Sequence, residues 1–528
     1  MSDRILHVLR RVAVVVGYVL VYVLVWMGLA LLIAAAGIRY YWGEISVGQM
    51  LSNLVSVEID GGGGSIIWVG ILGIGVAPVL ITAAIAAAHF VRRRNRRHSG
   101  DDVRPPRTTW FARSIATALV GAVVIGGTTA FATTVGVGNY IRAANSDFDL
   151  GDYYVEPTIT SDENARNLVL IYLESGEATL EDDQLFEKDA FTPLKDVTRA
   201  SEGWQNVENL QQYTGGGWTI AGISGTECGV PLKGTGSAAG AAPSNDLGSD
   251  TPTYLGGLTC AGDVLEEHGY TNVFLGGANS SFAAKESFLR SHGYSEVKGL
   301  ADWRAAGEPE ENFRSDWGLS DERLMDHAKD RIDELHAEAK RTGRPFNLSM
   351  LTLDTHEPAY VFDYCSVDTE HDITSVFSCS MAQVAGFVNH MKDRGYLDDT
   401  AVVIMGDHLK HMPAGDPFHE QLDNHPNRTI FNRIWVPGGD GAGTLRPRLD
   451  QLSMYPTILE AAGLTLKDGA AGLGVSAFAT RFPNGSAQAM DTGPYNELLE
   501  ALSLEFYADA WAVEDAERNA AGTTPPTR

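Results

Sequence analysis

The chain has 528 residues, with 67 acidic and 40 basic side chains and a formal net charge of −27 at pH 7. This length is too great for one ordinary domain, and the excess of negative charge argues against a nucleic-acid partner, because phosphate binding needs a basic surface. Positive charge is concentrated in the arginine-rich segment 92–97, and the acidity elsewhere is typical of a solvated surface.

Three long apolar stretches open the chain, at about residues 12–36, 66–90 and 115–137, and none contains Asp, Glu, Lys or Arg. Each is long enough to cross the ~30 Å hydrocarbon core of a bilayer as a helix of about 20 residues. The first is too long for the apolar core of a cleaved signal peptide, and two more follow it. We therefore predict a transmembrane region with three spans over residues 1–140.

The placement of basic residues predicts the orientation of these spans. Arginines precede the first span and are frequent between the second and third, in the segment 92–97 and at Arg104, Arg107 and Arg113, whereas only Arg39 lies between the first and second. Basic loops stay in the cytoplasm. We therefore expect a multi-pass protein of the cell membrane, with everything after about Asn139 on the extracytoplasmic side.

The remainder of the chain divides by composition. Residues 141–165 are polar and acidic and are expected to form a linker. Residues 166–510 form the predicted extracytoplasmic domain. Residues 511–528 are rich in Ala, Gly, Thr and Pro and are expected to be disordered.

Within the outer domain, short apolar runs alternate with helical patterns. Near-continuous apolar strands separated by helices indicate an α/β fold with a buried, mostly parallel sheet. In such sheets ligands lie beyond the carboxyl ends of the strands. The candidate strands are Leu168–Leu173, Val273–Gly276, Phe346–Leu353, Ala401–Met405 and Ile430–Val436, and the candidate helices are Asp321–Lys340 and Met381–Arg394.

All four cysteines lie in the outer domain: Cys228, Cys260, Cys365 and Cys379. An even number there predicts two disulfides in an oxidising compartment, in agreement with the predicted topology. Three pairings are possible, and nearness favours 228–260 and 365–379. Four free buried thiols are the alternative. A metal site of four cysteines is disfavoured, because no Cys-x-x-Cys spacing is present.

Polar residues follow several predicted strands. Glu174 ends the first, His356 follows the third, and Asp407 and His408 follow the fourth, while Thr219 lies in a glycine-rich turn. Carboxylate oxygens and imidazole nitrogens ligate divalent metals, and a metal can activate a hydroxyl as nucleophile. His356 is a candidate general acid, or a hydrogen-bond donor to the phosphate. Together these residues predict phosphoryl-type transfer through a covalent threonine intermediate.

Each residue alone allows a plainer interpretation. Glu174 and Asp407 could be capping or surface acids, and His356 could be an ordinary core histidine. Their common place at one edge of the predicted sheet is stronger evidence than any single motif. For the histidines that follow, a polar loop is favoured over a second metal site: His411, His419 and His425.

Short blocks of the outer domain carry a family resemblance: Leu173–Ser175, Gly217–Gly222, Cys228–Leu232, Gly276–Asn279, Phe282–Lys285, Ser291–Tyr294, Asp316–Leu319, Thr352–His356 and Asp407–Leu409. On these blocks, most of residues 166–475 resembles the phosphoglycerol transferase and lipoteichoic acid synthase group of the alkaline phosphatase/sulfatase superfamily. The sulfatase signature Cys/Ser-x-Pro-x-Arg does not surround Thr219, which argues against sulfatase activity.

The resemblance implies an alkaline phosphatase/sulfatase-like domain and roles for its residues. Thr219 would carry a glycerophosphoryl group, and His356 would act in catalysis and contact substrate. Asn279 stands where the family often has Asp, and Glu357 where Gly or His is common, which bears on the donor head group. One divalent ion, Mn2+ or Mg2+, would be held by Glu174, Thr219, Asp407 and His408. The implied substrate-contacting residues are Lys285, Asn279, His356 and Trp317.

The expected function is therefore transfer of a glycerophosphoryl group from phosphatidylglycerol to a cell-envelope glycan by a membrane-anchored enzyme. The partners are a phospholipid donor and a glycan acceptor. One alternative is a phosphoethanolamine transferase with the same covalent logic. The other is a catalytically silent envelope-binding protein, which the intact set of metal-type residues argues against.

Overall fold

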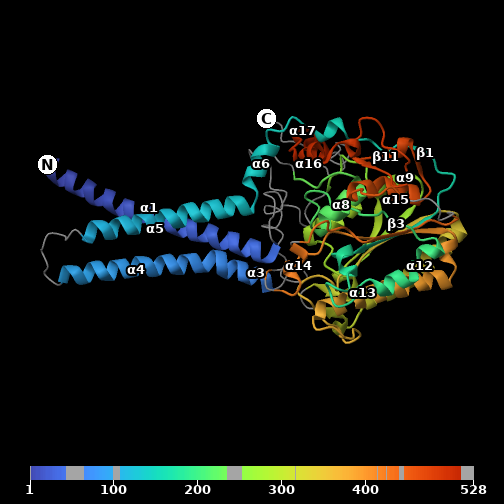
Figure 1. Cartoon of the computed structure of the whole chain (residues 1–528), viewed down its shortest axis with the longest axis horizontal. Coiled ribbons are helices and arrows are strands. Elements are labelled where there is room, and N and C mark those ends of the chain that lie inside the picture. The colour runs from blue at the N-terminus through green and yellow to red at the C-terminus, as the bar shows by residue number, and fades with distance from the viewer. Residues whose placement is uncertain are drawn as a thin grey trace, which may run out of the picture. The chain divides into compact units, whose positions relative to one another are not determined.

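The computed structural model describes residues 2–42, 65–98, 108–234, 253–314, 317–412, 414, 416–423, 425–438 and 445–512. The described chain forms two compact units, one up to Tyr140 and one from Ile141 onward (Figure 1).

The first unit is helical. It contains α1 (Ser2–Trp42), a second helix built from α3 (Ser65–Gly70), a π-helical segment (Ile71–Val76) and α4 (Ala77–His98), and then α5 (Thr108–Thr134). Three stretches among the described residues are long and apolar enough to cross a membrane: His7–Tyr41, Trp68–Arg92 and Ser114–Thr134. The three predicted spans are therefore helices of the expected length. The π-helical segment was not predicted.

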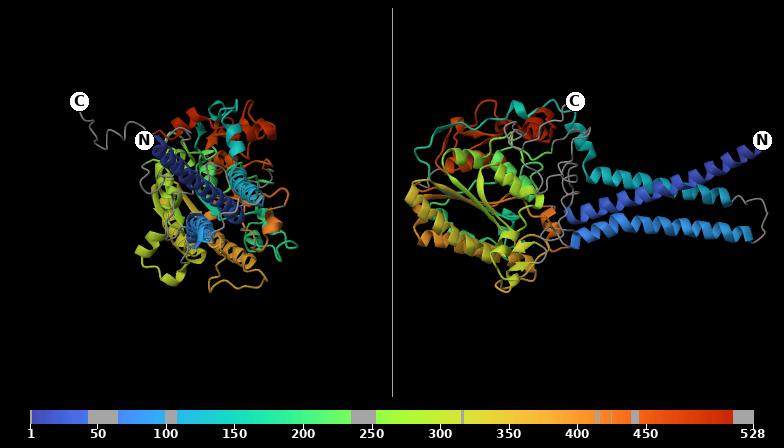
Figure 2. Two further views of the ribbon diagram at one scale, coloured as in Figure 1. Left: turned by 90° about the vertical axis from the view of Figure 1, so that its left-hand side faces the viewer. Right: turned by 180° about the vertical axis from the view of Figure 1, so that it is seen from behind.

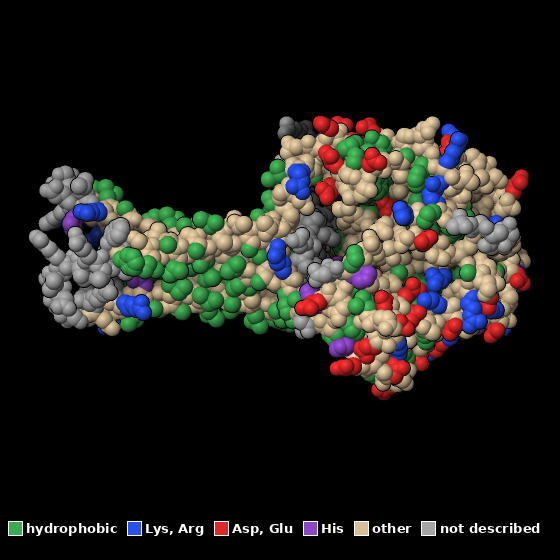
Figure 3. Space-filling view, viewed as in Figure 1, with side chains coloured by type: hydrophobic (Ala, Val, Ile, Leu, Met, Phe, Trp, Pro, Cys, Tyr) green, Lys and Arg blue, Asp and Glu red, His purple; other side chains and the backbone are tan. Residues whose placement is uncertain are grey.

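Helices α1 and α5 cross closely at two glycines. A Cβ atom added to Gly127 would lie 2.1 Å from the carbonyl oxygen of Gly28. Small residues allow such close approach of membrane helices, where packing replaces the hydrophobic effect. Large apolar side chains on the outside of this unit are exposed; Ile125, for example, is 69% exposed. A lipid environment would suit this surface, which is hydrophobic along the unit (Figure 3).

The second unit contains a six-stranded sheet in the order β4-β3-β7-β2-β8-β9. Neighbours are parallel except for β9, which runs antiparallel to β8 at one edge. The predicted α/β class with a mostly parallel sheet is confirmed. The strands are β2 (Asn167–Leu173), β3 (Thr271–Gly276), β4 (Tyr294–Lys298), β7 (Phe346–Leu351), β8 (Thr400–Gly406) and β9 (Asn432–Trp435).

Alternate residues of β2 enter two different cores. Leu168, Leu170 and Tyr172 join the core under α8 (Thr219–Cys228), whereas Val169 and Ile171 join the other core. Helices therefore cover both faces of the sheet, as the ribbon views show (Figure 2). With α8, the first face carries α9 (Ala261–Glu267), α10 (Lys285–Ser291) and α15 (Met454–Ala461), and the second carries α11 (Leu300–Ala305), α12 (Asp321–Thr342) and α13 (Asp372–Asp393).

The remaining elements are short. The helices are α6 (Val137–Ala143), α7 (Thr192–Val197), α14 (His419–Asp423), α16 (Thr492–Glu500) and α17 (Leu504–Ala510). The strands are β1 (Ile159–Ser161), β5 (Phe313–Arg314), β6 (Gly318–Leu319), β10 (Thr465–Leu466), β11 (Ala470–Ala471) and β12 (Gly474–Val475). Single 3₁₀ turns span Leu150–Asp152, Ala178–Glu181, Ala200–Glu202, Phe282–Ala284, Glu310–Asn312, Tyr396–Asp398, Gln451–Ser453, Lys467–Gly469 and Ala487–Ala489.

Residues 141–165, predicted as a linker, are instead packed on the outer unit. Strand β1 pairs with β10, and Val155 forms a bridge with Gly472. Leu150 is fully buried, and its N–H donates to Ser503 Oγ over 2.9 Å. The segment was predicted as a linker because it is mostly polar, and these few contacts leave little signal in its composition.

At the C-terminus, the indole of Trp511 donates to the carbonyl of Lys233 over 2.8 Å. Its ring centroid lies 4.8 Å from that of Tyr254. The first residue of the predicted disordered tail is therefore packed. Residues 513–528 lie outside the described residues.

Candidate active site and metal centre

The ends of β2 and β8 lie side by side at one edge of the sheet. Leu173 is opposite Gly406 in their register, so the residues that follow, Glu174 and Asp407, are neighbours. Asp407 Oδ1 accepts a 2.8 Å hydrogen bond from the backbone N–H of Ser175 and another of 2.8 Å from the backbone N–H of His408. The structure thus brings the two predicted strand-end acids together.

Glu174, Asp407 and His408 each offer one ligand atom, and these atoms all lie within 4.8 Å of one another. All three residues are buried. His408 Nε2 lies 3.6 Å from Glu174 Oε1 and 3.6 Å from Asp407 Oδ2. Its Nδ1 lies 2.8 Å from the carbonyl oxygen of Leu409. Nδ1 therefore carries a proton, and Nε2 faces the two carboxylates, where its lone pair could ligate a cation.

The second oxygen of the Asp407 carboxylate tests whether a cation suits this place. Oδ2 is buried and has no hydrogen-bond partner among the described residues. An unpaired buried polar atom costs about 1–3 kcal/mol, so buried polar atoms are nearly always paired. Carboxylate oxygens and an imidazole nitrogen are suitable ligands for a divalent cation. The buried acidic–histidine group therefore fits a metal site.

The charges in this group depend strongly on one another. Burial, and then the neighbouring Glu174, raise the pKa of Asp407 to about 7. Burial also opposes ionisation of Glu174, but His356 and His408 outweigh it and hold the pKa of Glu174 at about 2. Burial opposes protonation of His408, yet the two carboxylates raise its pKa. A bound cation would favour the ionised form of both acids.

Thr219 is the first residue of α8, after Trp218 in an extended conformation. Its Oγ1 donates to Glu174 Oε2 over 3.3 Å. The hydroxyl therefore joins the acidic–histidine group, as the glycine-rich turn predicted. The first N–H groups of a helix lack acceptors within it and favour anions. A phosphate near Thr219 would meet this positive end of α8.

Two glycines of α8 allow the close packing that holds Thr219 in place. A Cβ atom at Gly222 would lie 2.0 Å from the carbonyl oxygen of Asp407, and one at Gly225 would lie 2.5 Å from the ring of Tyr213. The side chain of Gln451 links the same groups, since Nε2 donates to Asp407 O over 2.5 Å and Oε1 accepts from Tyr213 N over 3.3 Å. Gly222 and Gly225 therefore permit α8 to pack closely against these groups.

The loop after His408 is also tied to the turn before Thr219. His411 Nε2 lies 2.7 Å from the carbonyl oxygen of Gly217, and Gln212 Oε1 accepts from Leu409 N over 2.8 Å. His411 thus belongs to the site as a backbone partner, a role that the sequence did not indicate. His419 Nδ1 instead lies 2.8 Å from Met412 O. Within the described ranges, His411 and His419 join no group of potential metal ligands.

His356 is held against Trp317, with 3.8 Å between the ring centroids. Its Nδ1 lies 2.9 Å from the carbonyl oxygen of Glu357, which also accepts from Trp317 Nε1 over 2.9 Å. One carbonyl therefore orients both predicted side chains. His356 is one of the charges that lower the pKa of Glu174.

Lys410 is a buried cation that sequence analysis missed. Its Nζ donates to the carbonyl of Thr355 over 2.8 Å and forms an ion pair with Glu357. The Thr355 hydroxyl in turn donates to the carbonyl of Glu174 over 2.6 Å. Lys410 therefore connects the loop of His408 to the loop of His356. Its position two residues after His408 was the available signal.

Lys285, the first residue of α10, is 5% exposed. Burial lowers its pKa to about 8, while the charges of Glu174 and Asp407 oppose that shift. Lys285 therefore lies within electrostatic reach of the acidic group. Asn279 serves a local turn, because its Oδ1 accepts from the N–H and hydroxyl of Ser281 over 3.0 and 2.9 Å.

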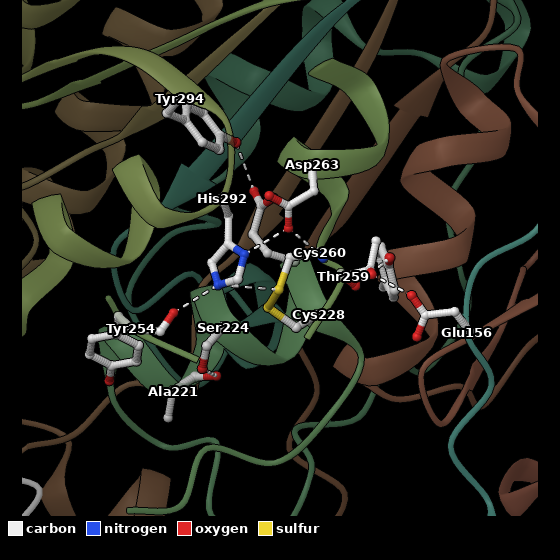
Figure 4. The surroundings of a disulfide bond; sticks show 12 residues. Glu156, Ala221, Ser224, Cys228, Tyr254, Thr259, Cys260, Asp263, His292 and Tyr294 are labelled. Atoms are coloured by element: carbon white, nitrogen blue, oxygen red, sulfur yellow. Dashed lines mark hydrogen bonds and ion pairs between the residues drawn. A yellow bond between two sulfur atoms is a disulfide. The ribbon is translucent and has the colours of Figure 1, made fainter. Parts of the chain in front are cut away.

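A second group of ligand-type residues lies at the other end of α8 (Figure 4). Cys228 and Cys260 form the predicted disulfide. His292 Nδ1 lies 2.7 Å from Asp263 Oδ2, and its Nε2 lies 2.9 Å from the carbonyl oxygen of Tyr254 and 3.6 Å from Cys260 Sγ. Because the sulfurs are bonded to each other and both ring nitrogens have partners, this group has no vacancy for a metal.

The other predicted disulfide is wrong. Cys365 and Cys379 are free thiols. Cys365 Sγ lies 3.6 Å from the carbonyl oxygen of Ser375 and donates to it. Cys365 lies in the loop before α13 and Cys379 within that helix, and the two thiols are close enough to interact although no bond joins them.

A family model described as Sulfatase matches residues 166–464, more than half of the chain. The chain belongs to the sulfatase family. This membership confirms the predicted resemblance at the level of the superfamily. The acidic–histidine group lies within the matched residues.

This member of the sulfatase family is 31% identical over 347 residues to a protein named phosphoglycerol transferase I from Escherichia coli O127:H6, covering 63% of this chain and 42% of that protein. A protein of the same name from Shigella boydii serotype 18 is 33% identical over 279 residues, covering 51% and 34%. The chain thus spans less than half the length of these relatives. The solved lipoteichoic acid synthase LtaP from Listeria monocytogenes aligns with a TM-score of 0.48 and 15% identity, covering 69% of this chain and 96% of that one.

Proposed function

We propose that the protein is a membrane-anchored transferase that moves a glycerophosphoryl group from phosphatidylglycerol to a cell-envelope glycan. The observation that carries this proposal is the Thr219 hydroxyl, hydrogen-bonded to Glu174 at the start of α8, in a site where Asp407 Oδ2 has no hydrogen-bond partner among the described residues. The relatives named phosphoglycerol transferase I support the choice of transferred group. The three apolar helices support a membrane anchor.

Glu174, Thr219, Asp407 and His408 would hold one divalent ion, Mn2+ or Mg2+. When bound, it would favour the alkoxide of Thr219 and offset the charge of the phosphate. Glu174 orients the hydroxyl by accepting its hydrogen bond. Thr219 gives its proton to solvent, its Oγ1 forms a bond to phosphorus, and the bond from phosphorus to the diacylglycerol oxygen breaks. Thr219 takes back a proton from solvent when the acceptor later displaces it.

His356 gives its proton to that leaving oxygen. It then takes the proton from the acceptor hydroxyl, whose oxygen bonds to phosphorus as the bond to Thr219 breaks. Lys285 contributes a positive charge to the phosphate. Trp317 positions His356 through the ring contact, and Asn279 borders the place of the head group. The outer unit works on the extracytoplasmic side in this proposal.

Mass spectrometry of the full-length protein tests the proposal. After incubation in nanodiscs with phosphatidylglycerol, Thr219 should carry one glycerophosphoryl group, and Thr219→Ala should carry none and release no diacylglycerol. A phosphoethanolamine adduct from phosphatidylethanolamine would identify the alternative transferase. Absence of any adduct together with absence of bound metal would support a silent binding protein and overturn the proposal.

A further inference from the structure

The outer unit exposes few large apolar side chains, and half of them lie in one loop. Among the described residues of this unit six such side chains are exposed, at Ile141, Val155, Tyr360, Val361, Val367 and Leu504. Three of the six fall within residues 358–367, here termed the apolar loop. Single exposed apolar residues are normal, but a concentration of them marks an interaction surface.

The apolar loop is held firmly from beneath. The buried guanidinium of Arg314 donates to the carbonyl of Pro358 over 2.8 Å and lies 5.6 Å from the ring of Tyr360. The rings of Tyr360 and Phe362 are 4.7 Å apart, and those of Phe362 and Tyr364 are 5.5 Å apart. Tyr360, at 40% exposed, and Val361, at 36%, are therefore presented by an ordered support.

The loop begins at the edge of the candidate active site. Pro358 is two residues after His356, and Arg314 also donates to the carbonyl of His356 over 3.1 Å. The same arginine therefore fixes the site histidine's backbone and the start of the apolar loop. The apolar loop therefore starts beside the backbone of His356.

We propose that the apolar loop docks on the surface of the phospholipid bilayer while the site takes a lipid head group. This inference rests on the proposed function, because a lipid donor must be met at a bilayer. Tyrosine suits the membrane–water interface, and exposed valines gain by leaving water. A sugar acceptor would stack on aromatic faces but would gain less from valine. The chain has a formal net charge of −27, so an anionic bilayer would repel it. Docking there would therefore depend on apolar contacts.

Kinetics of the full-length protein in nanodiscs provides the test. The double variant Tyr360→Ser/Val361→Ser is compared with the matched control Val155→Ser/Leu504→Ser. One assay uses long-chain phosphatidylglycerol in the disc, and the other adds soluble dihexanoyl phosphatidylglycerol to discs of phosphatidylcholine. We expect kcat/KM of the loop variant to fall about tenfold for the bilayer lipid, the loss of part of the burial of two side chains, and to change less than twofold for the soluble lipid. The control should change neither.

A second measurement does not depend on activity. A nitroxide at Val361→Cys should be relaxed more by oxygen, which concentrates in lipid, than by a water-soluble nickel chelate, and a nitroxide at Val155→Cys should show the reverse. Equal loss on both lipids, no loss on either, loss confined to transfer onto the glycan, or a water-exposed nitroxide at 361 would each overturn the docking proposal. If the wild type cleaves neither lipid, the proposed function fails, while the nitroxide still reports on docking.

Discussion

The two ends of helix α8 carry similar groups of residues with different chemical states. At its start, Thr219 lies against Glu174, beside Asp407. At its end, Cys228 is bonded to Cys260 beside His292. Both groups are buried and bring three potential ligand atoms within 4.8 Å. Only the first contains a buried carboxylate oxygen without a hydrogen-bond partner among the described residues. The unsatisfied atom, more than the kinds of residue present, distinguishes a candidate metal site from a structural core.

The largest expected effect comes from removing that atom's charge. Asp407→Asn keeps the size of the side chain but deletes an anionic ligand, so metal affinity should fall by at least about a hundredfold and turnover should be lost. Asp263→Asn is the matched change at the other end of α8 and should leave metal content unaltered. Elemental analysis of both variants decides the matter. Equal metal content in the two would remove the proposed distinction.

Breaking the disulfide should act on stability and spare the metal. Cys228→Ala/Cys260→Ala should lower the free energy of unfolding by about 2–4 kcal/mol, because a cross-link restricts the unfolded chain. Urea denaturation measures the loss, and elemental analysis measures the metal. Unchanged stability, or metal lost from the folded variant, would contradict the separation of the two ends.

His411→Phe should sharpen the account of the Thr219 end. It removes the donor to Gly217 and leaves a ring, so Thr219 should be misplaced while the proposed metal ligands remain. Displacement of a reacting group by about 1 Å can cost a hundredfold. We expect kcat to fall about 10- to 100-fold with KM little changed and metal retained.

His411→Gln, which keeps a donor, should recover part of the lost turnover. His390→Phe serves as the control. It replaces a histidine of α13 that contacts Asp333 of α12, and this variant should turn over normally. A His411→Phe variant with the kcat of wild type would mean that the contact with Gly217 has no role in the reaction.

The smallest effect concerns Glu227, next to Cys228. Its Oε1 accepts from the hydroxyls of Tyr172 and Tyr294, each over 3.0 Å. Burial raises the pKa of Glu227 to about 7, against the opposing effects of both tyrosines and His292. In the unfolded chain the pKa of this carboxyl lies near its ordinary value of 4.5. The folded protein therefore binds the extra proton between these values, and stability falls as pH rises through that window.

Replacing Glu227 by Gln removes the titrating group. The variant's free energy of unfolding should depend less on pH between about 4.5 and 7 than that of the wild type, by roughly 1–3 kcal/mol across the window. Thermal unfolding at several pH values measures this difference. Parallel curves for the two proteins would show that Glu227 titrates normally.

Much of the fold and part of the site could be predicted because strong local patterns set them. Continuous apolar strands marked the sheet, and parallel strands ending in Glu174 and Asp407 had to bring those acids to one edge. Strand β4 was missed because its edge sequence, Tyr294–Lys298, is mostly polar. The start of α13 was missed because residues 372–380 contain several helix-disfavouring serines, threonines and β-branched residues.

The missed contacts involve groups that leave little trace in a single sequence. The partner of His411 is a backbone carbonyl, which any residue could supply. Lys410 contacts a carbonyl and the acid of Glu357, both distant along the chain. Cys365 and Cys379 are neighbours but remain free thiols, because nearness alone does not fix the geometry that a disulfide needs.

The unbroken register of β2 and β8 has a consequence for changes in chain length. Seven residue pairs connect Asn167↔Thr400 to Leu173↔Gly406, and the two acids come next. Losing one residue inside either strand turns its following side chain to the opposite face. Single-residue deletions should therefore abolish function throughout both strands, even where a substitution is mild. Single-residue deletions in exposed turns far from the site should be tolerated. The positions at which deletions abolish function would therefore coincide with the paired residues of β2 and β8, which hold the two acids together.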